Sequence, residues 1–480
     1  MVQGRTLIPA FRGRRRVRRR WPALSLILFA LGGAALAWRG YVEAQWRGIV
    51  VLAGSLNTPV ADSIADHLTE APIVQNAVVA GVPTTIVLPR GGGRHPAVVF
   101  VNGATPLGRY EPHVERLTRA LARAGFAVFV PAPTGLREGQ ITLATLASTV
   151  GVIDAVARRP DVGKLSLLGA SVGCSVALVA AESPQLAGRV SAVAGLAPYT
   201  DLRAAIMMAL TGRYPTGPGR SVPYRPGPFL GLVVARSLVA ALPPSPNRQM
   251  LLAQLEAIPD DAAAPLATVS RSPVGLFGPE ARTVLRLLNN RDSSRFASLY
   301  AALPAEVRTG IWRMSPKSGA RRLRMPVELV SAPDDTYFPP AQYPPLLREA
   351  PSVHLTVTST LKHAVPSVSF DTLRGLAQLD GFAVRSLRDF APPVPVNWLA
   401  VAVGLLALCL VAAEGFAPRH GLVGLSGLIA AGGAAAALLR PVGVDVPLVV
   451  ALAAELAGAA LVGTRPGGRL AHRRRRGSPA

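Results

Sequence analysis

Ser171 lies in the pentapeptide Gly169–Gly173 (GASVG), between an apolar run at 165–168 and a helix-like run at 174–181. A buried strand, a G-x-S-x-G turn and a helix, in this order, form a nucleophile elbow, which exposes the serine hydroxyl at the carboxyl end of the strand. Free N–H groups at the start of the helix stabilise the oxyanion of acyl transfer. The pattern therefore indicates a nucleophilic serine, with an ordinary glycine-rich turn as the alternative.

A serine in this turn requires an acid and then a histidine, each in a loop after a later strand. Asp335 follows the predicted strand at 326–331, and His363 follows the predicted strand at 353–358. The adjacent Asp334 is an alternative acid, because neighbours on one turn cannot be ranked by chemistry alone. Asp201 is a weaker third option. The other histidines precede Ser171, lie inside a predicted strand or flank apolar segments: His67, His95, His113, His354, His420 and His472.

These residues predict two-step acyl transfer. His363 accepts the Ser171 proton while the hydroxyl attacks an ester or similar carbonyl, and water then releases the acyl group. The reaction needs no metal and no organic cofactor, so none is expected. Cys174 and Cys409 give neither a disulfide framework nor a cysteine metal site. The run Val162-Gly163-Lys164 lacks the earlier glycine and the following Ser/Thr of a phosphate-binding loop.

The elements that position these residues alternate between strand and helix. Segments 76–80 and 84–89 read as an antiparallel pair, and the continuous apolar run at 96–103 is typical of a central strand. Further strands are predicted at 126–131 and 190–198, with helices at 112–124, 142–158, 344–349 and 368–390. This alternation predicts an α/β fold with a doubly wound, mostly parallel sheet and a site at the carboxyl ends of its strands.

The alternation stops between residues 202 and 324. Proline and glycine are dense from 214 to 228, and helical patterns follow at 249–258, 279–288 and 295–303. An insertion of this length is too long for a structureless loop in a compact domain. We expect a mostly helical cap that covers the site and selects substrates.

Apolar runs near both ends predict membrane helices. Residues 21–38 are long enough to cross a bilayer, although a cleaved signal peptide shares the pattern. Three further runs, at 394–413, 421–439 and 446–462, predict three transmembrane helices within 394–463. A buried helical hairpin is the alternative for these runs.

The net charge of +24 is concentrated beside the apolar runs. Arginines crowd the tails at 1–20 and 464–480, as expected of topology signals that stay cytoplasmic. Four spans place both termini on the same side, so the region between the first and second spans is expected outside the cytoplasm. The lipid bilayer is therefore a predicted partner and nucleic acid is not.

Several motifs resemble the α/β-hydrolase fold family, closest to its dienelactone-hydrolase and prolyl-oligopeptidase-like branch. They are DAVARRP at 154–160, followed by KLSLLGASVG at 164–173, then DTYFP at 335–339 and the late Lys362-His363. The resemblance extends from about residue 76 to about residue 390, which is about two thirds of the chain. We expect residues 41–201 and 325–392 to form the hydrolase domain. The resemblance makes Ser171 the nucleophile, His363 the base and Asp335 the orienting acid.

The same resemblance implies an oxyanion hole formed by the backbone N–H groups of Val172 and Ala104. Asn102 stands where many members have histidine, and Cys174 replaces a common glycine. We therefore expect a multi-pass membrane protein whose extracytoplasmic serine hydrolase domain cleaves a carboxylic ester of a small-molecule or lipid-like acyl substrate. A catalytically silent binding or scaffold domain and an acyltransferase with the same triad are the alternatives.

Overall fold

The computed structural model describes residues 39–55, 69–217, 219–267, 275, 277–366 and 373–391. Within these ranges, no helix has both the length and the apolar composition that a membrane crossing requires. The predicted membrane segments at 21–38 and 394–463, and the basic tails at 1–20 and 464–480, lie outside the described residues. Membrane insertion therefore stays a prediction.

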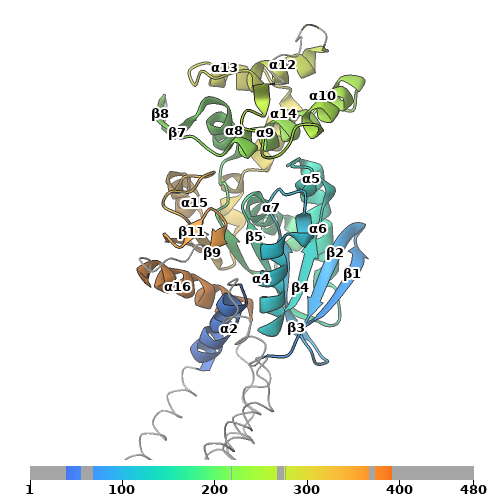
Figure 1. Cartoon of the computed structure of the whole chain (residues 1–480), viewed down its shortest axis with the longest axis vertical. Helices are drawn as coiled ribbons and strands as arrows, with labels where there is room; N and C mark the ends of the chain where they lie inside the picture. Colours follow the sequence, from blue (N-terminus) through green and yellow to red (C-terminus); the bar gives the residue numbers. More distant parts are fainter. Residues whose placement is uncertain are drawn as a thin grey trace, which may run out of the picture. The chain divides into compact units, whose positions relative to one another are not determined.

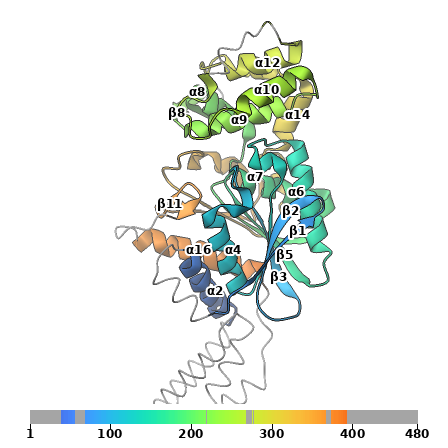
Figure 2. The same cartoon turned by 45° about the vertical axis from the view of Figure 1, so that its right-hand side comes forward.

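A mostly parallel sheet of eight strands forms the centre of the described chain (Figures 1 and 2). The strands are β1 (Ile73–Val79), β2 (Val82–Leu88), β3 (His95–Val101), β4 (Ala127–Pro131), β5 (Val162–Ala170), β6 (Val190–Leu196), β9 (Val327–Ser331) and β10 (Val353–Val357). Their order is β1-β2-β4-β3-β5-β6-β9-β10. The β1–β2 and β2–β4 pairs are antiparallel and the others are parallel. The predicted antiparallel pair and mostly parallel sheet are confirmed.

Burial explains why the central strands are continuous apolar runs. The side chains of β3 from Ala97 to Val101 are buried, as are those of β5 from Leu165 to Gly169. A strand covered on both faces has no solvent side, so alternation of polar and apolar residues is lost. By contrast, the edge strand β1 is largely exposed.

Helices cover both faces of the sheet. One face packs against α6 (Leu143–Ala157), α7 (Val172–Ala181) and the mostly helical region between β6 and β9, which we call the cap, in one large apolar cluster. The other face packs against α2 (Arg39–Ser55), α4 (Pro112–Arg123) and α16 (Leu373–Phe390), in a second cluster. We call this second apolar layer the α2/α4/α16 layer. Figure 2 shows its three helices gathered on the same side of the molecule.

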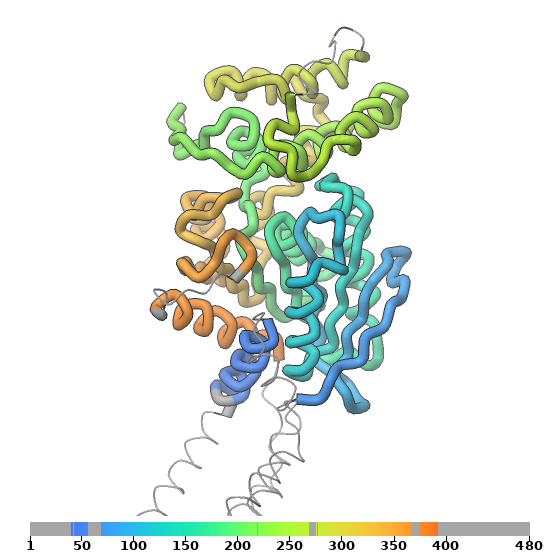
Figure 3. Tube along the Cα trace, viewed as in Figure 1, coloured from blue at the N-terminus to red at the C-terminus, as the bar shows by residue number. Residues whose placement is uncertain are grey.

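Helix α2 was not predicted from the sequence, although it completes this layer. Gln45 Nε2 of α2 donates to Asp380 Oδ2 of α16 at 2.9 Å, and the two helices lie side by side in Figure 3. A Cβ on Gly54 would lie 2.8 Å from Ala120 Cβ, so glycine lets α2 approach α4 closely. The guanidinium of Arg47 is buried and lies 5.5 Å from the centre of the Phe126 ring.

The region between β6 and β9 is mostly helical, as expected. Its helices are α8 (Leu202–Thr211), α9 (Pro228–Ala240), α10 (Pro246–Glu256), α12 (Pro279–Leu288), α13 (Phe296–Ala301) and α14 (Ala305–Arg313). It also contains an unpredicted hairpin of β7 (Arg213–Gly217) and β8 (Arg220–Pro223). Gly212 precedes β7, Gly219 lies in the turn between β7 and β8, and both adopt left-handed conformations. Glycines that indicated a loop therefore flank and connect two short strands.

The remaining elements are short. They are α5 (Thr134–Arg137), α15 (Pro344–Glu349), β11 (Leu361–Lys362), β12 (Val365–Pro366) and 3₁₀ turns at Gly108–Tyr110, Pro184–Leu186, Pro316–Ser318, Ala320–Arg322 and Pro340–Gln342. Helices α12 and α15 have the predicted bounds.

Candidate active site

Ser171 occupies a strained turn between β5 and α7. Its φ of 53° and ψ of −130° lie outside the conformations that serine ordinarily adopts, and such strain costs about 1–3 kcal/mol. The Ser171 N–H donates to the carbonyl oxygen of Leu196 on the neighbouring strand at 2.7 Å. The surrounding structure thus fixes the turn and presents the hydroxyl beyond the end of β5.

Three glycines make this turn sterically possible. A Cβ on Gly173 would lie 2.0 Å from the Asn102 carbonyl oxygen, and one on Gly169 would lie 2.3 Å from Cys174 Cα. A Cβ on Gly195 would lie 1.9 Å from Cys174 Sγ. The thiol of Cys174 therefore occupies the space beside Gly195 that any side chain at position 195 would need. Burial raises the pKa of Cys174, which disfavours the thiolate and leaves this side chain a packing role.

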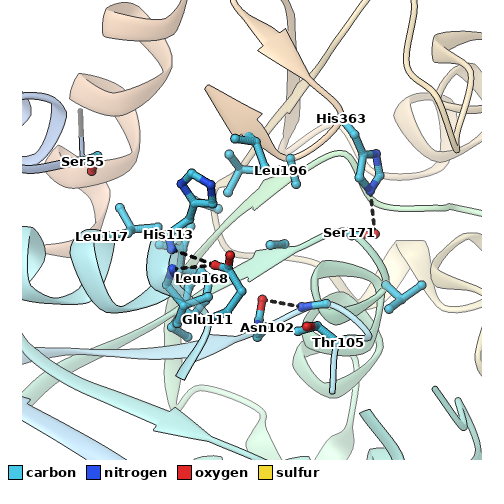
Figure 4. Close-up of a pocket in the computed structure, with 18 of the residues that line it drawn as sticks. Ser55, Asn102, Thr105, Glu111, His113, Leu117, Leu168, Ser171, Leu196 and His363 are labelled. Atoms are coloured by element: carbon cyan, nitrogen blue, oxygen red, sulfur yellow. Dashed lines mark hydrogen bonds between the residues drawn. The ribbon is translucent and has the colours of Figure 1, made fainter. Parts of the chain in front are cut away.

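His363 lies at the turn between β11 and β12 and faces Ser171. Its Nε2 lies 2.7 Å from Ser171 Oγ, a contact drawn in Figure 4. Its Nδ1 lies 2.9 and 3.0 Å from the two carboxylate oxygens of Asp335. His363 also has a positive φ of 54°, and its ring centre lies 4.6 Å from that of Tyr337. The structure thus brings all three sequence-predicted residues into one hydrogen-bonded chain.

Asp335 is held rigidly and is 3 % exposed. Its Oδ1 accepts hydrogen bonds from the backbone amides of Tyr337 and Phe338 at 2.7 and 2.8 Å. The Tyr224 hydroxyl, from the segment that follows β8, donates to the Asp335 backbone carbonyl. Two amides and one imidazole therefore converge on the carboxylate, while the cap fixes its main chain.

The two alternative acids are placed elsewhere. Asp334 is exposed to solvent. Asp201 Oδ1 accepts from the amides of Arg203 and Ala204 and caps α8, and its other oxygen pairs with Lys317. Asp335 is the carboxylate that meets His363.

The loop after β3 borders Ser171 where the oxyanion hole was expected. Asn102 Nδ2 donates to the Gly108 carbonyl oxygen, and Asn102 Oδ1 accepts from the Gly103 amide, both at 2.8 Å. Asn102 thereby shapes this loop from within. Val172 is the first residue of α7, and both Val172 and Ala104 line the cavity that contains Ser171. Their roles as oxyanion donors stay predictions.

A cavity of about 360 Å³ contains Ser171 and His363 and extends into the α2/α4/α16 layer. Figure 4 shows Ser55 and Leu117 on the opposite side of this cavity from Ser171 and His363. Helix α9 of the cap supplies Phe229, Leu230 and Val233 to its lining. We call this space the acyl-side cavity. A second cavity of about 290 Å³ lies between α6, α8, α9 and α14 and shares lining residues with the first.

Sequence reasoning missed most of the acyl-side cavity. Val51, Leu52 and Ser55 come from the unpredicted α2, so no interpretation of the sequence could assign them to a site. Helix α16 was predicted, and the apolar spacing of Leu379 and Phe382 could have indicated a buried face, although not that a cavity borders it. Among the described residues, no His, Cys, Asp or Glu cluster has the arrangement of a metal site.

Comparisons with known proteins find similarity only among solved structures. No family model matches the sequence, and no curated protein matches it. Acylaminoacyl peptidase from Pyrococcus horikoshii is 12 % identical, with a TM-score of 0.37, over 63 % of this chain and 39 % of that one. This chain thus spans well under half of that peptidase. Est1E from Butyrivibrio proteoclasticus is 13 % identical, with a TM-score of 0.37, over 66 % of this chain and 99 % of Est1E. Dienelactone hydrolase from Anabaena variabilis is 16 % identical, with a TM-score of 0.33, over 66 % and 97 %.

Proposed function

We propose that this chain is a serine hydrolase that cleaves a carboxylic ester through an acyl-enzyme on Ser171. The observation that carries the proposal is the 2.7 Å separation of Ser171 Oγ from His363 Nε2, with Asp335 on the other ring nitrogen. An imidazole in this position accepts the hydroxyl proton as the oxygen attacks a carbonyl. The strained turn keeps the nucleophile in place before substrate arrives.

In the first half-reaction, Ser171 Oγ forms a bond to the carbonyl carbon, and its proton moves to His363 Nε2. The amides of Val172 and Ala104 donate to the resulting oxyanion. His363 then gives the proton to the leaving alcohol oxygen as the ester C–O bond breaks. Asp335 keeps Nδ1 protonated and stabilises the imidazolium that forms.

In the second half-reaction, water takes the place of the alcohol. His363 accepts a proton from the water as its oxygen attacks the acyl carbon, and the same oxyanion donors serve again. The Ser171 ester bond then breaks, the proton returns to Ser171, and the carboxylic acid leaves. No step draws on Cys174.

A fluorophosphonate probe tests the proposal directly. We expect the folded full-length chain to form one phosphonyl adduct on Ser171, mapped by peptide mass spectrometry, and Ser171→Ala to form none. Ser148→Ala is the matched control, because Ser148 is an exposed serine on α6 whose hydroxyl donates only within its own helix. Absence of an adduct on Ser171, while a control esterase reacts, would refute the proposal.

The short triad distances favour an enzyme over a silent scaffold domain. Acyl transfer to an acceptor other than water uses the same residues, so product analysis with an added lipid or sugar alcohol separates it from hydrolysis. Release of free carboxylic acid as the main product supports hydrolysis. A transferred acyl group supports the transferase.

We also propose that the catalytic domain is anchored in the cell membrane and lies outside the cytoplasm. The support is the sequence pattern of apolar runs at 21–38 and 394–463 beside arginine-rich tails. Reporter fusions at residue 480 and within the 202–324 region test the topology. Cytoplasmic reporter activity at both positions would contradict it.

A further inference from the structure

The acyl-side cavity leads away from the reacting atoms into an apolar layer. One end holds Ser171 and His363, and the opposite side holds Ser55 of α2 and Leu117 of α4 (Figure 4). Leu168 of the sheet and Phe382 of α16 supply further walls. The space is therefore bounded by the sheet on one side and by the helices of the α2/α4/α16 layer on the other.

The chemistry of the walls identifies what this space can bind. Among the described residues that line it, none is a lysine or an arginine, so a phosphate or carboxylate there would have no permanently charged cation. His113 also lines it, and its Nδ1 already lies 3.1 Å from Arg116 Nη2. The carboxylate in the lining, Glu111, already accepts from the amides of His113 and Val114 as the cap of α4. Leu52, Leu117 and Leu379 present aliphatic groups. Such walls suit an uncharged hydrocarbon.

We propose that the acyl-side cavity binds the unbranched aliphatic acyl chain of the substrate, with the ester carbonyl at Ser171 and the methyl end near α2. This inference rests on the proposed esterase function and names its substrate class. Taking one methylene to fill about the 30 Å³ of a liquid water, a volume of about 360 Å³ holds a chain on the order of ten carbons. Short esters therefore leave most of the cavity unfilled.

Helix α2 lines this space on the side away from Ser171. Val51, Leu52 and Ser55 line it, and the Gln45–Asp380 hydrogen bond ties α2 to α16. In the sequence, α2 directly follows the predicted membrane segment 21–38, and α16 ends a few residues before the predicted segment at 394. A long acyl ester can come from a membrane lipid or from a soluble monoester, and both present the same hydrocarbon to the cavity.

Chain-length selectivity tests the proposal. The full-length protein in lipid nanodiscs is assayed with p-nitrophenyl acetate, butyrate, hexanoate, octanoate and decanoate. We expect kcat/KM to rise up to about fourfold per methylene, the equivalent of about 0.8 kcal/mol per buried CH₂, as the cavity fills. A wild-type optimum at acetate or butyrate, with longer esters slower, would overturn the inference.

A substitution that fills the cavity provides the second measurement. Ala383 lines the cavity on α16, and Ala377 lies exposed on the same helix. We expect Ala383→Phe to lower the decanoate-to-butyrate ratio of kcat/KM at least tenfold, and Ala377→Phe to keep the wild-type ratio. Leu117→Trp, from α4, makes the same test if Ala383→Phe does not fold. An unchanged ratio in the folded cavity variant would refute the assignment.

Different results would refute the esterase function and the binding of an acyl chain in the acyl-side cavity. If fluorophosphonate does not label Ser171 and no ester is cleaved, the esterase function itself is wrong. If Ser171 is labelled and short esters react without chain-length selectivity, only the acyl-chain assignment is wrong. Release of fatty acid from phosphatidylcholine vesicles would support a membrane source of the chain, and cleavage confined to monomeric esters would support a soluble source.

Discussion

Replacing Asp335 by asparagine removes one charge from the site and keeps its shape. In the native site, Asp335 Oδ1 accepts hydrogen bonds from the amides of Tyr337 and Phe338 at 2.7 and 2.8 Å. Both carboxylate oxygens lie within 3.0 Å of His363 Nδ1. An asparagine has a single oxygen, which the two amides require. Its NH₂ group then faces Nδ1, so His363 must accept a hydrogen bond there and carry its proton on Nε2. That tautomer cannot accept the proton of Ser171.

The expected loss is large and confined to the chemical step. A wrong imidazole tautomer in a Ser-His-Asp triad lowers kcat about 10⁴-fold, which corresponds to about 5.4 kcal/mol of activation free energy. KM should change little, because Asp335 is buried and does not line the acyl-side cavity. The assay is steady-state hydrolysis of p-nitrophenyl butyrate by the full-length protein, with thermal unfolding to verify that the variant folds.

The neighbouring carboxylate is the matched control. Asp334→Asn removes the same charge from an exposed side chain of the same loop, so we expect it to change kcat less than about threefold, in the range of ordinary surface substitutions. A kcat for Asp335→Asn within tenfold of wild type would refute the assigned acid. An equal decrease in kcat for both variants would show that kcat depends on the net charge of this loop rather than on the Asp335–His363 contact.

Two further tests measure the stability of the fold. Gly173→Ala should lower the free energy of unfolding by about 1–3 kcal/mol, because its Cβ would meet the Asn102 carbonyl oxygen at 2.0 Å. Gly92→Ala, with open space around its Cβ, should change it by less than about 0.5 kcal/mol in denaturant unfolding, and equal losses would contradict the steric argument. Burial raises the pKa of Glu182 from 4.5 to about 8, so the folded state holds this proton more tightly than the unfolded state, and stability should fall as pH rises from 4.5 through about 8. Glu182→Gln should therefore flatten this decline and exceed wild type at pH 9 by about 1–4 kcal/mol, whereas an unchanged pH profile would show that Glu182 is not its source.

Local signals accounted for most of the sheet and for the placement of Ser171. Continuous apolar runs predicted β3 and β5, and the glycines of the pentapeptide predicted the tight turn between β5 and α7, because backbone geometry is specified within a few residues there. The order of acid and histidine along the chain then placed Asp335 and His363 in loops after strands. These inferences needed only the sequence neighbourhood of each residue.

The features that the sequence did not reveal depend on tertiary contacts. Asp334 and Asp335 are chemically equal neighbours in the sequence. They differ in the fold, because Asp335 is buried and its carboxylate accepts hydrogen bonds from two backbone amides. Helix α2 carries glycines at 48 and 54 that lower its helical propensity, yet close packing against α16 and α4 explains their presence. The acyl-side cavity is a space between elements, and no segment of the sequence encodes it alone.

The hydrogen bond from Tyr224 to the backbone of Asp335 limits how this protein can be re-engineered. Chimaeras that replace residues 202–324 by the corresponding region of another protein would remove this hydrogen bond while leaving Ser171, His363 and Asp335 in the sequence. A loss of turnover in such a chimaera would then mimic a change of specificity. Transplanted insertions should keep a tyrosine, or another hydroxyl donor, at this junction.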